Sequence, residues 1–520
     1  MERLMRKISN PRYAWLLGVI LTFTLACSKD HPKVTPPVEQ AADNNLTSFG
    51  FTKAENPGLW NDITTEIKND TVYAHTLVGT DISGLIADFK HEGVSVRVDG
   101  VEQKSGNTKQ DFSHLVKYSI VAENGDQHTY VVKFSDTGMP AVYISTGGQP
   151  INSKDNYVEG EIRITKGLNG KLLYEGVMEI KGRGNSTWGM PKKPYRIKLD
   201  KKAPLLDMPS NKNWALMANY GDQSLLRNDV AFEVSRRFEM EYTPRQKYVE
   251  LFLNGEYMGN YNLTEHVKEG KDRVPVDEDN GGYVLEEDGY ADQEPSHFRT
   301  PKNMPITIKF PDEDDITTDQ YNYIKDYVSD FEKSLFSARG TSEGNYQQYF
   351  DLPSFVNYYL INEICGNPDM LWSMRMYKKS SQDPKIYVGP VWDFDLGFNN
   401  DKRIGKEDAQ QKLMLTNAHD PRYWMDEIRK DPAFKQMVRS RWNSIKSSLQ
   451  TLPEYIDSVD NYIKYSQIPN FKRWDNILGV NINQSWYTAQ THEEYVDFVR
   501  DYLTKRIAWL DGVFNGAEFN

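Results

Sequence analysis

Acidic side chains at two points of the chain have the spacing that metal-assisted chemistry uses. The apolar residues 386–392 are followed directly by Asp393 and Asp395, and acids at positions i and i+2 leave a strand on the same side. Carboxylate oxygens are the ligands that Mg²⁺ prefers when it also binds phosphate. Asp369 follows the predicted helix of residues 354–365, where an acid is well placed to act as a general base. The pattern therefore predicts two metal ligands near a catalytic Asp369.

A glycine-rich segment between two predicted strands could bind an anion. Residues 181–189 read KGRGNSTWG, and their glycines allow successive backbone amides to approach a phosphate closely. On the next predicted strand, Arg196 and Lys198 add two cations to the polar face. The alternative is a solvated strand face beside structurally inert carboxylates. The candidate cofactor ligands inside the segment are Arg183, Asn185 and Ser186.

Several other chemistries lack their sequence signatures. The chain has no H-E-x-x-H zinc motif, no G-x-S-x-G nucleophile elbow and no G-x-x-x-x-G-K-[ST] phosphate loop. Two cysteines exclude a disulfide framework and the usual cysteine zinc site. The net charge of -12, from 62 basic and 74 acidic residues, argues against a global nucleic-acid-binding role. Cys365 lies in an apolar run, which indicates a buried structural thiol.

The first 45 residues have the features of an export signal and a tether. A basic start precedes the apolar residues 14–26, which are fewer than the ~20 that a spanning helix needs. The sequence Thr-Leu-Ala-Cys ending at Cys27 resembles the lipobox of bacterial lipoproteins. We therefore expect a signal peptide over residues 1–26 and an acylated Cys27 that begins a tether over residues 27–45. The protein would be lipid-anchored in the cell envelope, at the outer membrane or cell surface. A plain secretory signal with an incidental cysteine is the alternative.

Hydrophobic periodicity divides the rest of the chain into a β module and a larger body. Residues 46–136 alternate apolar and polar side chains between glycine-bearing turns, which predicts a small antiparallel, sandwich-like module that serves as a spacer. Strands dominate residues 139–316, and helical periodicity dominates residues 317–520. We expect an α+β body with a strand-rich lobe, a helix-rich lobe and a cleft between them. The acidic runs expected in solvated loops are residues 277–279, 286–288 and 312–315.

Several segments, taken in order, resemble the CotH kinase family of atypical protein kinases. They read GRGNSTW with PKKPYRIKL, LLRNDVAFEVSRRF, YVELFLNGEYMGNYNLTEHV, GGYVLEED, TIKFPDED and GPVWDFDLGF. The resemblance covers about residues 141–400 and part of the helical tail. It implies a two-lobed, highly diverged protein-kinase-like domain that binds ATP and Mg²⁺ and phosphorylates Ser or Thr of a protein acceptor.

The resemblance also implies a role for individual residues. Asp369 resembles the catalytic-loop acid that orients and deprotonates the acceptor hydroxyl. Asp393 resembles the metal-binding acid, with Asp395 as a second candidate. Lys198, or else Arg196, would contact the α- and β-phosphates. The residue that would pair with that lysine is Glu233.

One position departs from the kinase pattern. A kinase catalytic loop carries an Asn for a second Mg²⁺ about four or five residues after the acid. Ser373 and Met374 stand at those positions, and Asn399 or Asn400 could substitute. The alternative function is therefore a weak or inactive kinase-like surface protein that binds a glycan or protein through its abundant aromatic residues. A glycoside hydrolase with paired carboxylates is a third hypothesis, which the resemblance disfavours.

Overall fold

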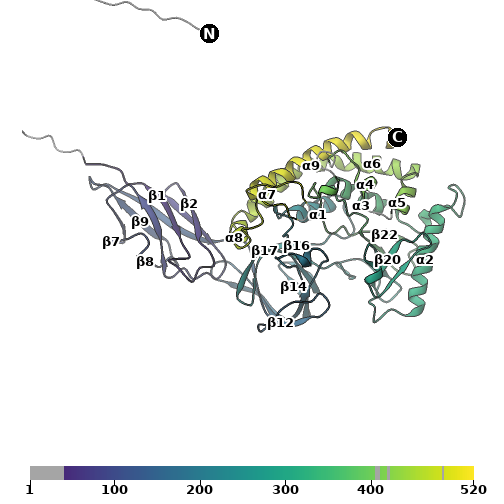
Figure 1. Cartoon of the computed structure of the whole chain (residues 1–520), viewed down its shortest axis with the longest axis horizontal. Helices are drawn as coiled ribbons and strands as arrows, with labels where there is room; N and C mark the ends of the chain where they lie inside the picture. The colour runs from purple at the N-terminus through teal and green to yellow at the C-terminus, as the bar shows by residue number, and fades with distance from the viewer. Residues whose placement is uncertain (1–39, 405–409, 419–421, 483–484, 520) are drawn as a thin grey trace, which may run out of the picture.

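The computed structural model describes residues 40–404, 410–418, 422–482 and 485–519. The predicted signal peptide, Cys27 and most of the tether lie outside the described residues. Figure 1 shows the β module at one end of the molecule, followed by a strand-rich region and then by the helices. The described chain is a mixed α+β structure whose N-terminal part is rich in strands.

The β module of residues 46–136 is built on an eight-stranded sheet. Its strand order is β5-β1-β2-β3-β10-β9-β6-β7, and β4 pairs separately with β8. The pairing is antiparallel as predicted, except that β10 runs parallel to β3. Six other strands lie between β3 and β10 in the sequence, and this long excursion permits the parallel return. The strands are β1 (Leu46–Phe51), β2 (Ile63–Lys68), β3 (Thr71–Thr76), β4 (Leu85–Ile86), β5 (Asp88–His91), β6 (Ser95–Val98), β7 (Val101–Glu102), β8 (Lys109–Gln110), β9 (Val116–Val121) and β10 (Gln127–Asp136).

A closed seven-stranded barrel follows the module. Its order is β11-β12-β13-β14-β15-β17-β16, and β11 closes it by pairing in parallel with β16. The barrel has its own apolar core, which includes the fully buried Trp214 and Tyr261. The predicted turn at Asn254 and Gly255 joins β16 to β17, and both residues have positive φ angles, as a tight hairpin requires. The strands are β11 (Ala141–Ser145), β12 (Val158–Lys166), β13 (Lys171–Gly182), β14 (Tyr195–Leu205), β15 (Met208–Met217), β16 (Gln246–Leu253) and β17 (Glu256–Glu265).

A second, five-stranded sheet takes strands from both sides of the predicted boundary at residue 316. Its order is β19-β20-β18-β21-β22. The expectation that residues 286–288 lie in a solvated loop is wrong, because they form the buried end of β18. The strands are β18 (Tyr283–Asp288), β19 (His297–Arg299), β20 (Pro305–Phe310), β21 (Ser373–Lys378) and β22 (Ile386–Val388).

The helices share one large apolar core with this second sheet. Helix α1 lies within the strand-rich part of the sequence but packs on α3, α6 and α7. In the described ranges, none of the helices has the length and apolarity needed to cross a membrane. The helices are α1 (Arg227–Arg237), α2 (Thr318–Phe336), α3 (Leu352–Cys365), α4 (Met414–Asn417), α5 (Tyr423–Ile428), α6 (Pro432–Leu449), α7 (Leu452–Ile463), α8 (Gln467–Arg473) and α9 (His492–Phe514).

Candidate active site

A cavity of about 490 Å³ brings together residues from distant parts of the sequence. Its walls come from the glycine-rich segment, from the start of α1, from the second sheet and from the loops after α3 and β22. The predicted site residues that line it are Arg183, Asn185, Ser186, Asp369, Asp393 and Asp395. Three predicted residues are not among the described residues that line it, namely Lys198, Arg196 and Glu233.

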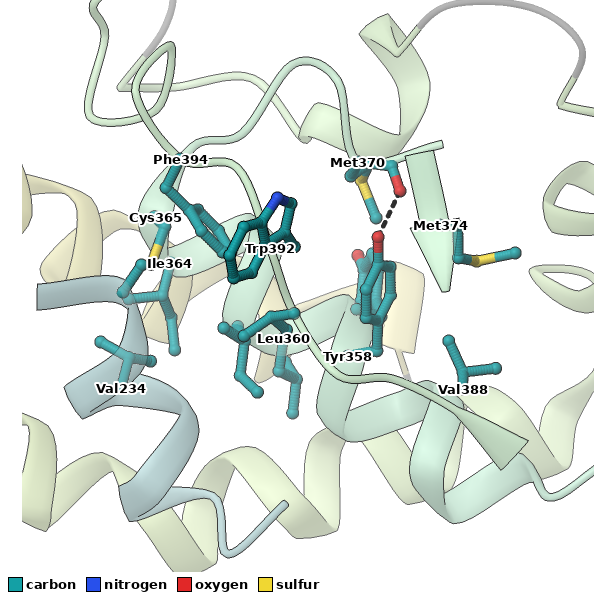
Figure 2. Close-up of a cluster of buried hydrophobic side chains, with 14 of the residues drawn as sticks. Val234, Tyr358, Leu360, Ile364, Cys365, Met370, Met374, Val388, Trp392 and Phe394 are labelled. Carbon is teal, nitrogen blue, oxygen red and sulfur yellow. Dashed lines mark hydrogen bonds between the residues drawn. The ribbon is translucent and has the colours of Figure 1, made fainter. Parts of the chain in front are cut away.

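The end of α3 positions Asp369. Gly366 ends the helix with a φ of 58°, the left-handed conformation that glycine adopts most easily. The Asn367 side chain then donates to Asn362 Oδ1 (3.0 Å) and accepts from the Asp369 backbone amide (3.1 Å). Figure 2 shows the Tyr358 hydroxyl donating to the Met370 carbonyl, a 2.5 Å bond that ties the helix to the loop beyond it. Asp369 thus sits on a loop that is held at both ends.

The loop after β22 positions the other two acids. The predicted strand over residues 386–392 ends at Val388, and the chain then runs irregularly into Asp393, whose φ is 67°. On either side of Asp393, Trp392 and Phe394 turn into the core beside α3 (Figure 2). The Phe394 amide donates to Asn228 Oδ1 (2.9 Å) at the start of α1. A left-handed residue anchored on both sides is a local strain of the kind found at functional sites.

Asp395 carries a large pKa shift. Burial raises the pKa of its carboxyl well above the usual range, and the neighbouring Asp393 carboxyl adds to the shift. Asp369 lies near enough to contribute as well. The acids predicted at positions i and i+2 are therefore neighbours in space, and their mutual repulsion favours a bound cation or proton.

The glycine-rich segment lines the same cavity as these acids. Gly182 gives the Trp188 indole room against the backbone, since a Cβ on Gly182 would lie 2.5 Å from the ring. The Arg183 guanidinium lies 5.3 Å from the Trp392 ring centroid and donates to Met217 Sδ (2.7 Å). Burial lowers the Arg183 pKa, an effect that the Asp393 carboxylate opposes.

Several cations lie close to Arg183. Arg375 and Arg196 lie close enough to Arg183 to lower its pKa further. The Nε atoms of Arg375 and Arg196 are buried, and neither has a hydrogen-bond partner among the described residues. Arg375 Nη1 is paired with Glu286 at 2.9 Å. Partly buried guanidinium groups that lie close together create a place where an anion would be stabilised.

Two predicted cofactor ligands lie elsewhere. Lys198 is an exposed residue on β14 and pairs with its cross-strand neighbour Glu179 at 3.7 Å. Glu233 pairs within α1, with Arg236 and Arg237, both at 2.9 Å. The expected contact between Lys198 and Glu233 is thus absent from the described structure. Strand alternation correctly separates Lys198 from the core, but it cannot tell the cavity side of a barrel from its solvent side.

Ser373 occupies a position where kinases carry the Asn that binds a second Mg²⁺, and its side chain has another partner. The Ser373 hydroxyl donates to Glu286, which also faces Arg375 and Lys309. Asn400 donates to the Asp395 carbonyl (2.7 Å), and Asn399 accepts from Trp486 Nε1 (3.0 Å). Neither Asn399 nor Asn400 is among the described residues that line the cavity. They hold the loop in place.

The prediction missed several residues of the cavity wall. Lys309 Nζ lies between Glu286 (3.3 Å), Asp288 (3.6 Å) and Glu294 (3.1 Å). Arg403 pairs with Asp369 at 2.9 Å. Alternation along β21, where Ser373 and Arg375 share a face, is the signal that could have indicated Arg375. The other residues come from separate elements and had no local signal.

The residues present fit a magnesium nucleotide. Among the described residues, no three or more His, Cys, Asp or Glu side chains form a closed metal site. Mg²⁺ does not need one, because it is commonly held by one or two carboxylates together with phosphate oxygens. The Asp393–Asp395 pair supplies such carboxylates, and the guanidinium groups of Arg183 and Arg375, which line the same cavity, suit phosphate.

Comparisons with known proteins add a family match. The model of a protein family described as CotH kinase protein matches residues 180–510. A search of curated proteins gives no match. One similar solved structure is a crystal structure, at 2.05 Å resolution, of a candidate glycoside hydrolase from Bacteroides thetaiotaomicron. The two chains are 18% identical, with a TM-score of 0.16, and the match covers 42% of this chain and 55% of that one. This chain therefore spans about half of that protein, and a TM-score this low supports no argument about fold or activity.

Proposed function

Because the chain belongs to the CotH kinase protein family, we propose that it is an atypical kinase. It would transfer the γ-phosphate of ATP to Ser or Thr of a surface or secreted protein in a Mg²⁺-dependent reaction. The observation that carries the proposal is one cavity of about 490 Å³ that is lined by Asp369, Asp393 and Asp395 and also by Arg183. Phosphoryl transfer needs mainly positioned phosphates, a metal and an oriented acceptor, and this set could supply them.

Each residue has a distinct part in this proposal. Asp393 and Asp395 would hold Mg²⁺, and bound Mg·ATP would supply the phosphoryl group. Arg183 and Arg375 would bind phosphate oxygens, helped by the backbone amides of the glycine-rich segment. Asp369 would orient the acceptor hydroxyl and accept its proton, while Arg403 holds the carboxylate in place.

The test is phosphoryl transfer from γ-labelled ATP with Mg²⁺ by the purified protein. Asp369→Ala and Asp393→Ala should each reduce label incorporation by about 100-fold or more. The matched control is Asp279→Ala, which changes an exposed acid outside the cavity and should leave transfer unchanged. Label incorporation that survives both active-site substitutions would refute the assignment.

A second candidate is a kinase-like surface protein with little or no turnover that binds a glycan or a protein. It is favoured by Ser373, whose hydroxyl is engaged with Glu286 at the position where kinases hold a second Mg²⁺. The two candidates differ in nucleotide binding. Failure of the purified protein to bind ATP, together with absence of label, would favour the binding protein.

We also propose that the protein is anchored in the cell envelope through acylated Cys27, with an acceptor in the same compartment. The support is the lipobox-like sequence before Cys27. Labelling of growing cells with an alkyne fatty acid should mark the protein, and Cys27→Ser should remove the mark. A labelled Cys27→Ser variant would contradict this proposal.

A further inference from the structure

Lys192 is a buried cation close to the glycine-rich segment, and the roles proposed above do not use it. It lies three residues after Gly189, lines the cavity, and is only 1% exposed. Its Nζ atom donates to the Asn260 carbonyl (2.5 Å) and to Asn470 Oδ1 (2.9 Å). Nζ also lies 4.6 Å from the centroid of the Tyr261 ring. Lys192 thus connects the glycine-rich segment with β17 and α8.

The surrounding junction is polar, buried and tightly built. Asn470 Oδ1 accepts from the backbone amide of Asn260 (3.1 Å) as well as from Lys192. The side-chain amide of Asn260 donates through Nδ2 to Ser466 Oγ (2.7 Å). Asn260, Asn470 and Ser466 are all fully buried. A Cβ on Gly259 would lie 2.6 Å from Asn470 Oδ1 and 3.2 Å from the Lys192 Cε atom. Glycine at this position, with a φ of 106°, therefore permits α8 and Lys192 to approach β17 closely.

Burial of the Lys192 amine has a cost in folding free energy that simple packing of an apolar side chain would not have. No carboxylate among the described residues forms an ion pair with Lys192, and burial lowers its pKa to about 7, opposed by the Glu250 carboxylate. A buried amine that lacks an ionic partner destabilises the folded state unless its hydrogen bonds offset that cost. What the amine adds is a pair of strong, directed hydrogen bonds between three separate elements.

We propose that Lys192 is a positioning residue that fastens the glycine-rich segment to β17 and α8, and so holds Arg183 in place for the nucleotide phosphates. The consequence for catalysis rests on the proposed function, but the fastening itself does not. Without it, residues 182–191 would open more often, although the barrel beneath them stays folded.

Hydrogen–deuterium exchange of the nucleotide-free protein tests the fastening directly. Lys192→Met should raise exchange of residues 182–191 by about tenfold or more, the loss expected for a charge-assisted hydrogen bond. Asn470→Ala should give a similar rise, and the double variant should exchange no faster than either single one. The control is Lys472→Met, which changes an exposed α8 lysine that donates to the Asp62 carbonyl. Unchanged exchange in Lys192→Met and Asn470→Ala, additive effects, or a rise spread over the whole barrel would overturn the inference.

A kinetic measurement separates this inference from the proposed function. If the wild type transfers phosphate, Lys192→Met should raise the KM for ATP at least about fivefold and change kcat less than twofold. A fall in kcat at constant KM would contradict a positioning role. If the wild type transfers no label, the proposed function fails, while the exchange experiment still decides whether Lys192 fastens the segment.

Discussion

Two adjacent residues of β18 point to opposite faces of the strand, one toward the cavity and the other into the core. Glu286 faces the cavity and pairs with Arg375 and Lys309. Glu287 points to the opposite face, is 1% exposed, and its carboxyl oxygens have no hydrogen-bond partner among the described residues. Burial raises the Glu287 pKa well above the usual 4.5. Glu287 is therefore protonated in the folded protein at pH values where the unfolded chain has lost that proton.

Glu287→Gln should stabilise the protein at neutral and alkaline pH. A raised folded-state pKa means that the full stability is present only below about pH 4.5 and is lost as the pH rises toward the folded value. Within that window the wild type should lose about 1.4 kcal/mol of unfolding free energy per pH unit relative to the glutamine variant. Urea denaturation at several pH values measures this difference.

The matched control for that measurement is Glu278→Gln, which changes an exposed acid in the same part of the chain. It should show no pH-dependent gain in stability over the wild type. A Glu287→Gln variant whose stability relative to the wild type is the same at pH 5 and pH 8 would show that the Glu287 carboxyl is not buried and protonated.

Among elements, α3 has the most direct influence on the site. Its C-terminal Gly366 carries two constraints, because its φ is 58° and a Cβ at this position would overlap the Tyr502 hydroxyl. Gly366→Ala should lower the unfolding free energy by about 2–4 kcal/mol, from backbone strain and the steric overlap together. Urea denaturation measures the loss.

Gly340→Ala is the matched control for α3. Gly340 also has a positive φ (83°), but no heavy atom lies within 4 Å of its added Cβ. It should cost only about 1 kcal/mol, the strain of the left-handed conformation. Equal losses of unfolding free energy for the two substitutions would mean that the Tyr502 hydroxyl does not lie against Gly366.

The elements and the local hairpins could largely be predicted, but the pairing of strands that lie far apart in the sequence could not. The periodicity of residues 354–365 matches α3, and the alternation around Asn254 matches the β16–β17 hairpin. The acidic run at residues 286–288 resembled a solvated loop. Glu286 and Asp288 can be buried because Arg375 and Lys309, which lie far away in the sequence, pair with them. Similarly, the local pattern of Lys198 gave no sign that its side chain leaves the barrel on the solvent side.

The β module packs directly on the barrel. Leu77 and Val78 of the module share an apolar cluster with Ala141, Phe252 and Tyr257. The Tyr143 hydroxyl donates to the Val78 carbonyl (3.0 Å). Most of the connection between the two parts is buried as well. Met139 is fully buried and Thr137 donates to Glu250 (2.9 Å), while Gly138 is exposed.

Limited proteolysis with thermolysin should therefore leave residues 136–141 intact in the native protein. Val78→Asp places a charge in the shared cluster and should make this connection the first site of cleavage, because the buried carboxylate favours separation of the two parts. Mass spectrometry of the fragments identifies the cut. Early cleavage of the wild type between residues 136 and 141 would instead indicate a loosely attached module.

Only part of the candidate site could be predicted, because some of its residues lie in local motifs and others reach the cavity only through tertiary packing. Asp369, Asp393 and Arg183 belong to recognisable local patterns, and the structure brings them to one cavity. Lys309 reaches the same cavity from a distant strand, and Arg403 reaches it from a short helical turn eight residues after Asp395. No local pattern encodes these contacts. Short motifs therefore indicate the chemistry, while the complete cavity wall requires the fold.

Calorimetric titration with Mg·ATP shows whether the nucleotide binds in the cavity lined by Arg183 and the acidic pair. Arg183→Met should weaken binding at least about tenfold, as expected for loss of a charge-assisted bond to phosphate. Lys198→Met removes an exposed cation outside the cavity and should leave the Kd unchanged. Unchanged affinity in Arg183→Met combined with a loss in Lys198→Met would contradict the account.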